Sequence, residues 1–143
     1  DKLKKLKINQ EEKKKISLLT KGKDITINDK KIKSKLYTYG QKGRKISFIF
    51  DTKLCNNIKR LAKDADLAIM ESTYTNEEKQ LAASHNHMTA EQAAKSAKKA
   101  NTKELILTHI SQRYDNKEHQ ILKEAKRYFK NTKIARDFMR INI

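Results

Sequence analysis

Five side chains that could bind a metal or transfer a proton gather around the ends of predicted apolar segments. Asp51, Glu71 and His109 each follow directly on such a segment, and His85 and His87 lie in a loop before a predicted helix. Carboxylates and imidazoles bind zinc and act as general acids or bases near neutral pH. In layered α/β proteins, strand ends meet at one edge and bring such groups together. The pattern indicates a candidate catalytic or metal site, although strand-end carboxylates also occur as ordinary caps.

The elements that must position these residues alternate between strand-like and helix-like segments. Apolar runs predict buried strands at 46–50, 67–70 and 104–108. Apolar residues at helical spacing predict helices over 54–65, 77–84 and 121–129, and Thr89-x-x-Gln92 has the form of a capping box that starts another. Residues 134–135 and 139–143 can supply terminal strands. This alternation predicts an α/β fold.

Residues 1–44 differ from the rest of the chain. They are crowded with lysine and contain all three glycines. Residues 24–27 followed by 28–30 predict a strand and a tight turn, and residues 36–39 suggest another strand. We interpret residues 1–44 as a Lys-rich, arm-like β-element and residues 45–143 as the domain that holds the core.

The composition favours a polyanionic partner. The net charge is +17, from 34 basic and 17 acidic residues. Such a surface attracts nucleic acid, RNA above all, although a lysine-rich composition can also serve solubility alone. The single cysteine, Cys55, fits a reducing compartment such as the cytoplasm, and we expect it in or near the core. No apolar run approaches the roughly 20 residues of a membrane span, so no membrane association is expected.

Four segments in sequence order resemble the closing half of ribonuclease Z, where the family shows Gly-Asp-Thr, His-Glu-Ala-Thr, His-Ser-Thr and Leu-Thr-His-x-Ser-x-Arg-Tyr. The matching segments are Phe50-Asp51-Thr52, Met70-Glu71-Ser72-Thr73, His87-Met88-Thr89 and Leu107-Thr108-His109-Ile110-Ser111-x-Arg113-Tyr114. The resemblance covers residues 45–143 well and residues 1–44 weakly. It implies half of a metallo-β-lactamase-like αββα sandwich.

The resemblance also implies a zinc-dependent endoribonuclease that cleaves the 3′ trailer from precursor tRNA and leaves a tRNA 3′-hydroxyl. Asp51 matches a carboxylate that bridges the two zinc ions of one active site, and His109 matches a terminal zinc ligand. His87 matches the residue that protonates the leaving oxygen, and Glu71 matches a catalytic carboxylate that orients it. A homodimer is implied in the same way.

Substrate contacts are implied for three further residues. Arg113 is expected to hold a phosphate through its forked donors, and Ser111 and Thr89 are expected to touch substrate. Other interpretations stay open, because Arg113 could form a surface ion pair and Thr89 could serve only as a helix cap. His85 and His119 have no counterpart in the family and are expected at the surface.

Structural interpretations also stay open for the four central residues. Asp51 could cap the following helix, and His109 could be an ordinary buried, hydrogen-bonded histidine. His87 could cap the next helix from its loop, and Glu71 could be a strand-end cap.

The sequence departs from the family pattern in several places. Phe50, Met70 and Met88 replace the family's Gly, His and Ser, and the arm lacks a Gly-Pro pair. Leu3-Lys4-Lys5-Leu6 and residues 21–26 resemble the two ends of that arm, with the lysine cluster 10–15 between them. No His-x-His-x-Asp-His motif is present, and the chain opens with Asp1, so we expect the remaining zinc ligands upstream of Asp1.

Two rival functions remain at this point. One is another hydrolase of the same fold that acts on small phosphodiesters or other esters, since a fold alone does not define an activity. The other is a non-catalytic RNA-binding subunit that keeps half of a site.

Overall fold

The computed structural model describes residues 10–143, so the predicted arm end Leu3-Lys4-Lys5-Leu6 lies outside the described residues. Contacts between residues divide the chain into two compact units, Asp1–Gly43 and Arg44–Ile143. Each unit has its own cluster of buried apolar residues.

The first unit packs a helix and a short helical turn against a β-hairpin. Its elements are α1 (Gln10–Thr20), β1 (Ile25–Ile27), β2 (Lys30–Ile32) and α2 (Ser34–Tyr37). The predicted tight turn is confirmed, because Asn28 and Asp29 join the antiparallel strands with φ angles of 48° and 57°. These left-handed dihedrals suit the type I′ turns that connect two-residue hairpins. Leu19, Ile25, Ile27 and Ile32 form the buried cluster.

Two expectations for this unit differ from the structure. Helix α1 occupies the lysine-rich segment that was predicted to belong to a β-element. The predicted strand at 36–39 is wrong, because Leu36 and Tyr37 lie in α2. The start of this turn is held by Ser34, whose N–H donates to Asp24 Oδ1 at 2.9 Å and whose hydroxyl donates to the Gly22 carbonyl at 2.9 Å. These bonds favour a helical turn over a third strand.

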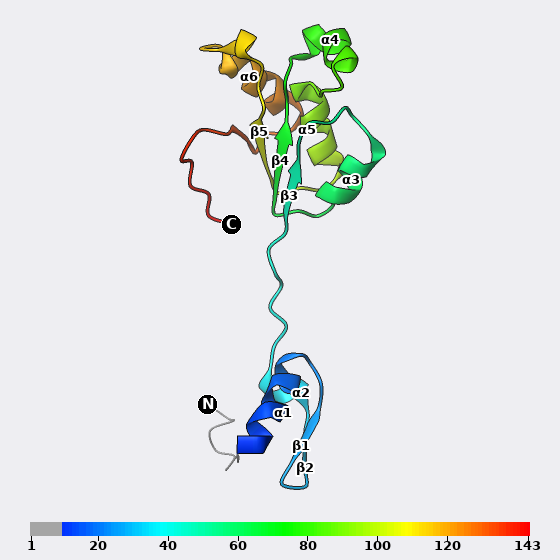
Figure 1. Ribbon diagram of the computed structural model, residues 1–143, viewed down its shortest axis with the longest axis vertical. Helices are drawn as coiled ribbons and strands as arrows, with labels where there is room; N and C mark the ends of the chain where they lie inside the picture. The colour runs from blue at the N-terminus through cyan, green and yellow to red at the C-terminus, as the bar shows by residue number, and fades with distance from the viewer. Residues whose placement is uncertain (1–9) are drawn as a thin grey trace. The chain divides into compact units, whose positions relative to one another are not determined.

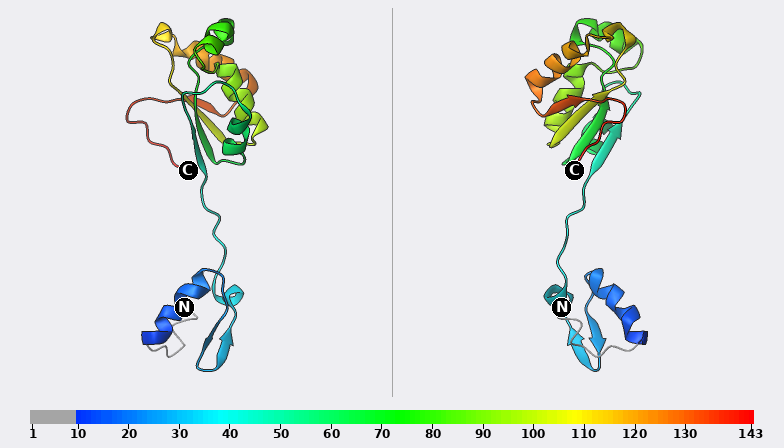
Figure 2. Two further views of the ribbon diagram at one scale, coloured as in Figure 1. Left: turned by 45° about the vertical axis from the view of Figure 1, so that its right-hand side comes forward. Right: turned by 90° about the vertical axis from the view of Figure 1, so that its left-hand side faces the viewer.

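The second unit is a parallel four-stranded sheet with helices on one face (Figures 1 and 2). The strand order is β3 (Ile46–Ile49), β4 (Leu67–Glu71), β5 (Glu104–Thr108) and β6 (Thr132–Ile134). The connections carry α3 (Asn56–Ala62), η2 (Asn76–Glu78), α4 (Lys79–Ser84), α5 (Ala90–Lys99), η3 (Gln112–Tyr114) and α6 (Glu118–Tyr128). The predicted α/β fold is confirmed.

The core of this unit lies between the sheet and its helices. Alternate strand residues on the helix side, including Ile49, Met70 and Leu107, are buried in one cluster with residues of α3, α5 and α6. Helix α5 contributes mostly alanine to this cluster. Small side chains let a helix approach the sheet closely, so the central helix lies directly against the strands.

The prediction that residues 46–50 form a buried strand is wrong for one face of β3. Ile46, Phe48 and Phe50 are 43%, 61% and 46% exposed, whereas Ser47 and Ile49 are buried. Within residues 44–143, helices pack on one face of the sheet, and β3 is one of its two edge strands. Alternation along the strand therefore places every second side chain on the face opposite the helices.

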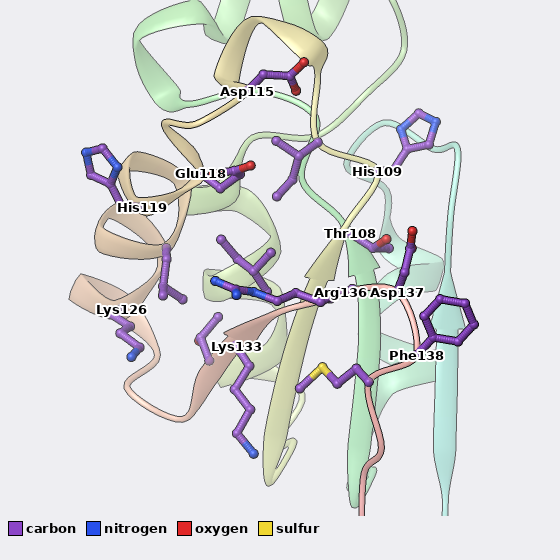
Figure 3. A pocket seen from close by; sticks show the side chains of 16 residues that line it. Thr108, His109, Asp115, Glu118, His119, Lys126, Lys133, Arg136, Asp137 and Phe138 are labelled. Carbon is purple, nitrogen blue, oxygen red and sulfur yellow. The ribbon is translucent and has the colours of Figure 1, made fainter.

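The end of the chain beyond β6 is irregular. Strand β6 includes Ile134, as predicted, but the predicted strand at 139–143 is wrong. Met139 N–H donates to the Arg136 carbonyl at 3.0 Å, which closes a turn instead of extending the ladder. This segment borders a surface pocket of about 1140 Å³ together with β5, β6 and α6 (Figure 3). Among the described residues, no helix is long and apolar enough to cross a membrane.

Candidate metal and catalytic site

Three polar side chains stand at the carboxyl ends of adjacent parallel strands. Asp51 follows β3, Glu71 is the last residue of β4, and His109 follows β5. Asp51 and His109 both adopt left-handed backbone angles, with φ of 44° and 55°. Few residues other than glycine adopt such angles, although Asp and His do so more often than most. The chain therefore turns sharply at the two residues whose side chains were predicted to bind a metal.

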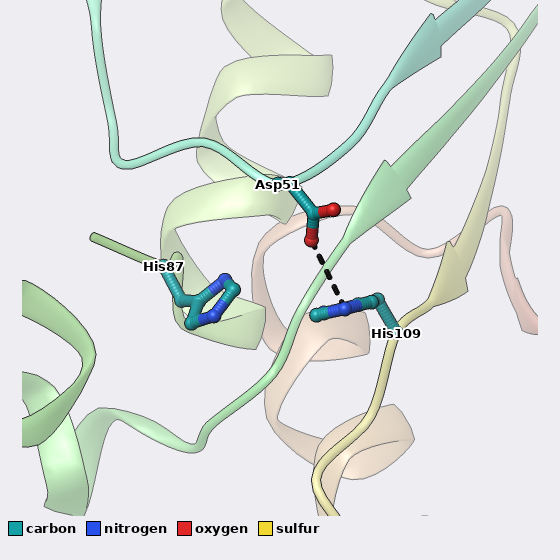
Figure 4. Close-up of side chains that lie close together, drawn as sticks. All are labelled: Asp51, His87 and His109. Atoms are coloured by element: carbon teal, nitrogen blue, oxygen red, sulfur yellow. Dashed lines mark ion pairs between the residues drawn. The ribbon is translucent and has the colours of Figure 1, made fainter. Parts of the chain in front are cut away.

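Asp51, His87 and His109 converge on one point (Figure 4). One potential ligand atom from each of the three residues lies within 4.8 Å of the others. His109 Nε2 is 3.0 Å from Asp51 Oδ1, and the rings of His87 and His109 have centroids 5.1 Å apart. A carboxylate oxygen and an imidazole nitrogen at this separation attract one another only when a proton or a cation lies between them.

Glu71 lies beneath this group, and its carboxylate joins three loops. The side chain is completely buried, yet its oxygens accept hydrogen bonds from Met88 N–H at 3.0 Å and from the Thr73 hydroxyl at 2.9 Å. They also accept one from Thr52 N–H and face His87 Nδ1 at 3.1 Å. Burying a carboxylate is costly unless its oxygens accept hydrogen bonds, and both oxygens of Glu71 have such partners. Glu71 therefore fixes the loops that carry Asp51 and His87.

The contact with Glu71 also fixes how the His87 ring presents its nitrogens. An ionised carboxylate only accepts hydrogen bonds, so His87 Nδ1 must carry the proton in this contact. His87 Nε2 is then the ring nitrogen that can contact a substrate or transfer a proton. The imidazole is 22% exposed, so its other edge is open to solvent.

Tyr74 is a residue of this region that the sequence analysis did not single out. Its ring is buried and lies 6.4 Å from the His87 ring, and its hydroxyl is 3.5 Å from His85 Nδ1. Arg113 lies over the same ring at 5.4 Å. The available signal was its position three residues after Glu71, where a strand end enters a loop. Tyr74 forms one wall of the site.

Arg113 is held in place by an ion pair. Its Nη1 donates to Glu78 Oε1, and this partner raises the pKa of Arg113. Glu78 is also bonded by the Tyr114 hydroxyl; burial raises the pKa of Glu78, but the bonds from Tyr114 and Arg113 lower it on balance. The guanidinium thus has a neighbouring carboxylate, as the ion-pair interpretation requires. Its contact with substrate stays a prediction.

Thr89 and Ser111 have clear structural roles. Thr89 is completely buried, its hydroxyl accepts from Gln92 N–H at 3.2 Å, and the Gln92 side chain accepts from Thr89 N–H at 3.0 Å. This confirms the predicted capping box. Ser111 N–H donates to the Thr73 carbonyl at 3.1 Å and joins the loop after β5 to the loop after β4. Contacts of either residue with substrate remain predictions.

The remaining candidates lie at the surface. His85 and His119 are exposed, as expected. The prediction that Cys55 lies in or near the core is wrong, because Cys55 is exposed at the N-terminal end of α3. The next buried position of that helix is Ile58, so the apolar face begins after the cysteine.

The donor set fits zinc. A carboxylate and an imidazole are common zinc ligands, and Asp51 Oδ1 and His109 Nε2 are near enough to share one ion, with His87 close beside them. His109 has its Nδ1 engaged by Thr73 at 3.0 Å, which leaves Nε2 directed at Asp51. A second partner on the far nitrogen is usual for metal-binding histidines.

A family profile described as "Beta-lactamase superfamily domain" matches residues 21–110, which is more than half of the chain. The chain belongs to this superfamily. Its relatives in the superfamily include the ribonuclease Z of Bacillus velezensis, which is 40% identical over 129 residues; the match covers 87% of this chain and 42% of that protein. The predicted resemblance to ribonuclease Z is confirmed.

Solved structures of the superfamily support the predicted fold. The short form of human tRNase Z is 31% identical with a TM-score of 0.56, and the match covers 79% of this chain and 36% of that chain. A metallo-beta-lactamase fold protein from Bacillus subtilis is 30% identical with a TM-score of 0.55, covering 64% of this chain and 36% of that one. The chain spans less than half the length of these relatives.

Proposed function

We propose that this chain provides part of the active site of a zinc-dependent endoribonuclease that removes the 3′ trailer from precursor tRNA. The observation that supports the proposal most strongly is the convergence of Asp51, His87 and His109 over the buried Glu71, in a chain 40% identical to a ribonuclease Z. Residues outside this chain would supply the other zinc ligands. Asp51 and His109 would hold the metal from this side.

Bound zinc would supply positive charge that lowers the pKa of a coordinated water and offsets charge on the scissile phosphate. The residues of this chain have separate tasks. Asp51 and His109 present a carboxylate oxygen and Nε2 at 3.0 Å from one another. The sharp turns at both residues hold these atoms at the edge of the sheet. Such preorganisation reduces the cost of assembling the site.

His87 acts as the proton donor in this proposal. Water attacks the phosphorus and releases one proton to solvent, the bond from phosphorus to the tRNA 3′-oxygen breaks, and His87 Nε2 gives its proton to that oxygen. The products are a tRNA 3′-hydroxyl and a trailer with a 5′-phosphate. After the transfer the neutral ring keeps its Nδ1 proton on Glu71, 3.1 Å away. Glu71 thus orients His87 through the contact with Nδ1.

The charge of the chain supports an RNA substrate. The net charge is +17, and Lys13, Lys14 and Lys15 are exposed on α1. Exposed lysines bind phosphates through charge, with an affinity that falls as salt rises. Arg113, Ser111 and Thr89 are the proposed substrate contacts nearer the site. A homodimer in the cytoplasm completes the proposal.

The test is cleavage of labelled precursor tRNA by the intact protein and four variants, with zinc content measured on the same samples. Asp51→Ala and His109→Ala are expected to lose zinc and cleavage together. His87→Ala is expected to keep zinc while its rate falls about 10²- to 10⁴-fold. His119→Ala removes an exposed imidazole of the same unit and is the control.

Unchanged cleavage and full zinc occupancy in Asp51→Ala would overturn the proposal. A generic phosphodiester assayed in parallel tests the rival hydrolase, which would cleave it at least as well as precursor tRNA. Salt-sensitive RNA binding without turnover would instead support a non-catalytic RNA-binding subunit.

A further inference from the structure

Thr73 lies between Glu71 and His109. Its hydroxyl oxygen is 2.9 Å from Glu71 Oε2 and 3.0 Å from His109 Nδ1. Thr73 follows β4 by two residues and is 6% exposed, so water has little access to the hydroxyl. The hydroxyl is therefore shared by two protein partners, one on each neighbouring strand end.

The single hydroxyl proton determines the direction of both bonds. The Glu71 carboxylate is an acceptor throughout, because it also accepts bonds from Thr52 N–H and Met88 N–H. Thr73 must therefore donate to Glu71. Its oxygen is then an acceptor toward His109, so His109 Nδ1 carries the proton in this contact. The opposite arrangement would place two lone pairs against each other at 2.9 Å.

We propose that Thr73 is a positioning residue that fixes His109 with its proton on Nδ1 and its Nε2 lone pair directed at the metal position beside Asp51. Glu71 then controls both imidazoles of the site, His87 directly and His109 through the Thr73 hydroxyl. The inference deepens the proposed function, because it rests on His109 being a metal ligand. A Thr73 side chain that served only to fill space in the fold would have no effect on metal affinity, whereas the proposed role predicts one.

Two substitutions separate this role from simple packing. Thr73→Val keeps the shape and removes the hydroxyl, whereas Thr73→Ser keeps the hydroxyl. Thr102→Val is the matched control, because Thr102 is equally buried in the same unit and donates to the Ala62 carbonyl at 3.2 Å. Thr102 precedes β5, at the opposite edge of the sheet.

The measurements are zinc affinity by competition with a chelator and histidine-selective ¹⁵N NMR of the intact zinc-loaded protein. Outer partners of metal-binding histidines change metal affinity about 10- to 100-fold. Thr73→Val is expected to weaken zinc binding by about 10-fold or more and to speed exchange of the His109 Nδ1 proton with water. Thr73→Ser and Thr102→Val are expected to match the parent protein in both measurements.

The proposal is overturned if Thr73→Val and Thr102→Val give the same zinc affinity and the same His109 spectrum. It is overturned equally if His109 coordinates zinc through Nδ1. If Thr73→Val does not fold, Thr73→Ala is measured in its place, because it also lacks the hydroxyl. Weaker zinc binding and a His109 spectrum changed more than in Thr102→Val support the role, and values equal to those of Thr102→Val contradict it. Precursor tRNA cleavage is not part of these readouts, so the inference can hold where the proposed substrate fails.

Discussion

His87 Nδ1 lies 3.1 Å from Glu71 Oε2, and the glutamate that it contacts is completely buried. The same carboxylate accepts hydrogen bonds from the loops after β3 and β4 and before α5. One ionised group thus fixes three loops at the edge where the candidate ligands converge. Removing its charge should affect the site more than the fold.

Glu71→Gln tests this relationship. The amide keeps the size of the side chain but has one acceptor oxygen in place of two, so a buried donor loses its partner at a cost of about 1–3 kcal/mol of folding stability. Cleavage is expected to fall about 10²-fold or more, because His87 loses its orienting charge. Urea unfolding and single-turnover cleavage measure the two effects. Parent-like cleavage by a folded Glu71→Gln protein would contradict the assigned role.

Asp51→Asn separates the charge of Asp51 from its backbone geometry. Asn adopts left-handed angles as readily as Asp, so the φ of 44° is retained and thermal stability should change little. The amide is a poor metal ligand beside a carboxylate, so zinc affinity is expected to fall at least about 10-fold. Calorimetric titration measures the zinc affinity, and thermal unfolding measures the stability. A large loss of stability without a loss of zinc would show that Asp51 serves the fold.

Arg113→Ala tests whether the guanidinium binds substrate in addition to Glu78. A lost phosphate contact should raise the KM for precursor tRNA and reduce the slope of binding against salt by about 1. Lys95→Ala is the matched control, because Lys95 also pairs with a glutamate, Glu91 at 2.5 Å, and lies over an aromatic ring, Tyr128 at 4.6 Å. Equal salt slopes for the two variants would leave Arg113 with a structural role only.

Thr89→Val tests the capping box at the start of α5. Loss of the hydroxyl leaves Gln92 N–H without its side-chain acceptor and is expected to cost about 1 kcal/mol of folding stability. Thr89→Ser should retain most of that stability. Urea unfolding of both variants provides the measurement. If Thr89→Val is as stable as the parent, the cap does not hold the helix and a substrate role becomes the better explanation.

The sequence predicted the site because strand ends in a parallel sheet are set by local patterns. Apolar runs ending at Asp51, Glu71 and His109 indicated that these residues lie at one edge, as they do in the structure, and the resemblance to ribonuclease Z suggested their roles. The capping box at Thr89 was also local, since one hydroxyl and one amide three residues apart define it. Such features depend on neighbours within a few residues and can be derived without the fold.

Other features depended on distant contacts and were missed. An apolar run such as 46–50 does not reveal that helices cover only one face of its sheet, so the exposure of Phe48 was not predicted. The bonding of Thr73 to His109 joins residues 36 positions apart, and no periodicity reports it. The helical turn at Ser34 depends on Asp24, ten residues earlier.

Asp66 connects the amino ends of three strands and should control acid stability. Its carboxylate accepts from Lys103 Nζ at 2.6 Å and from Lys45 N–H at 2.8 Å. These bonds, led by the one from Lys103, lower the pKa of Asp66 from 3.8 to about 2. A carboxylate with a lowered folded-state pKa stabilises the fold above its unfolded pKa, and this contribution is lost as the pH falls from about 4 toward 2.

Asp66→Asn should therefore lower stability at neutral pH and flatten its decline between about pH 4 and pH 2. The matched control is Asp64→Asn, since Asp64 accepts from the neutral amide of Asn101 at 2.8 Å rather than from an ammonium group. Urea midpoints measured across this pH range distinguish the two variants. An acid decline as steep in Asp66→Asn as in the parent would mean that other carboxylates, not this three-strand contact, set the acid limit.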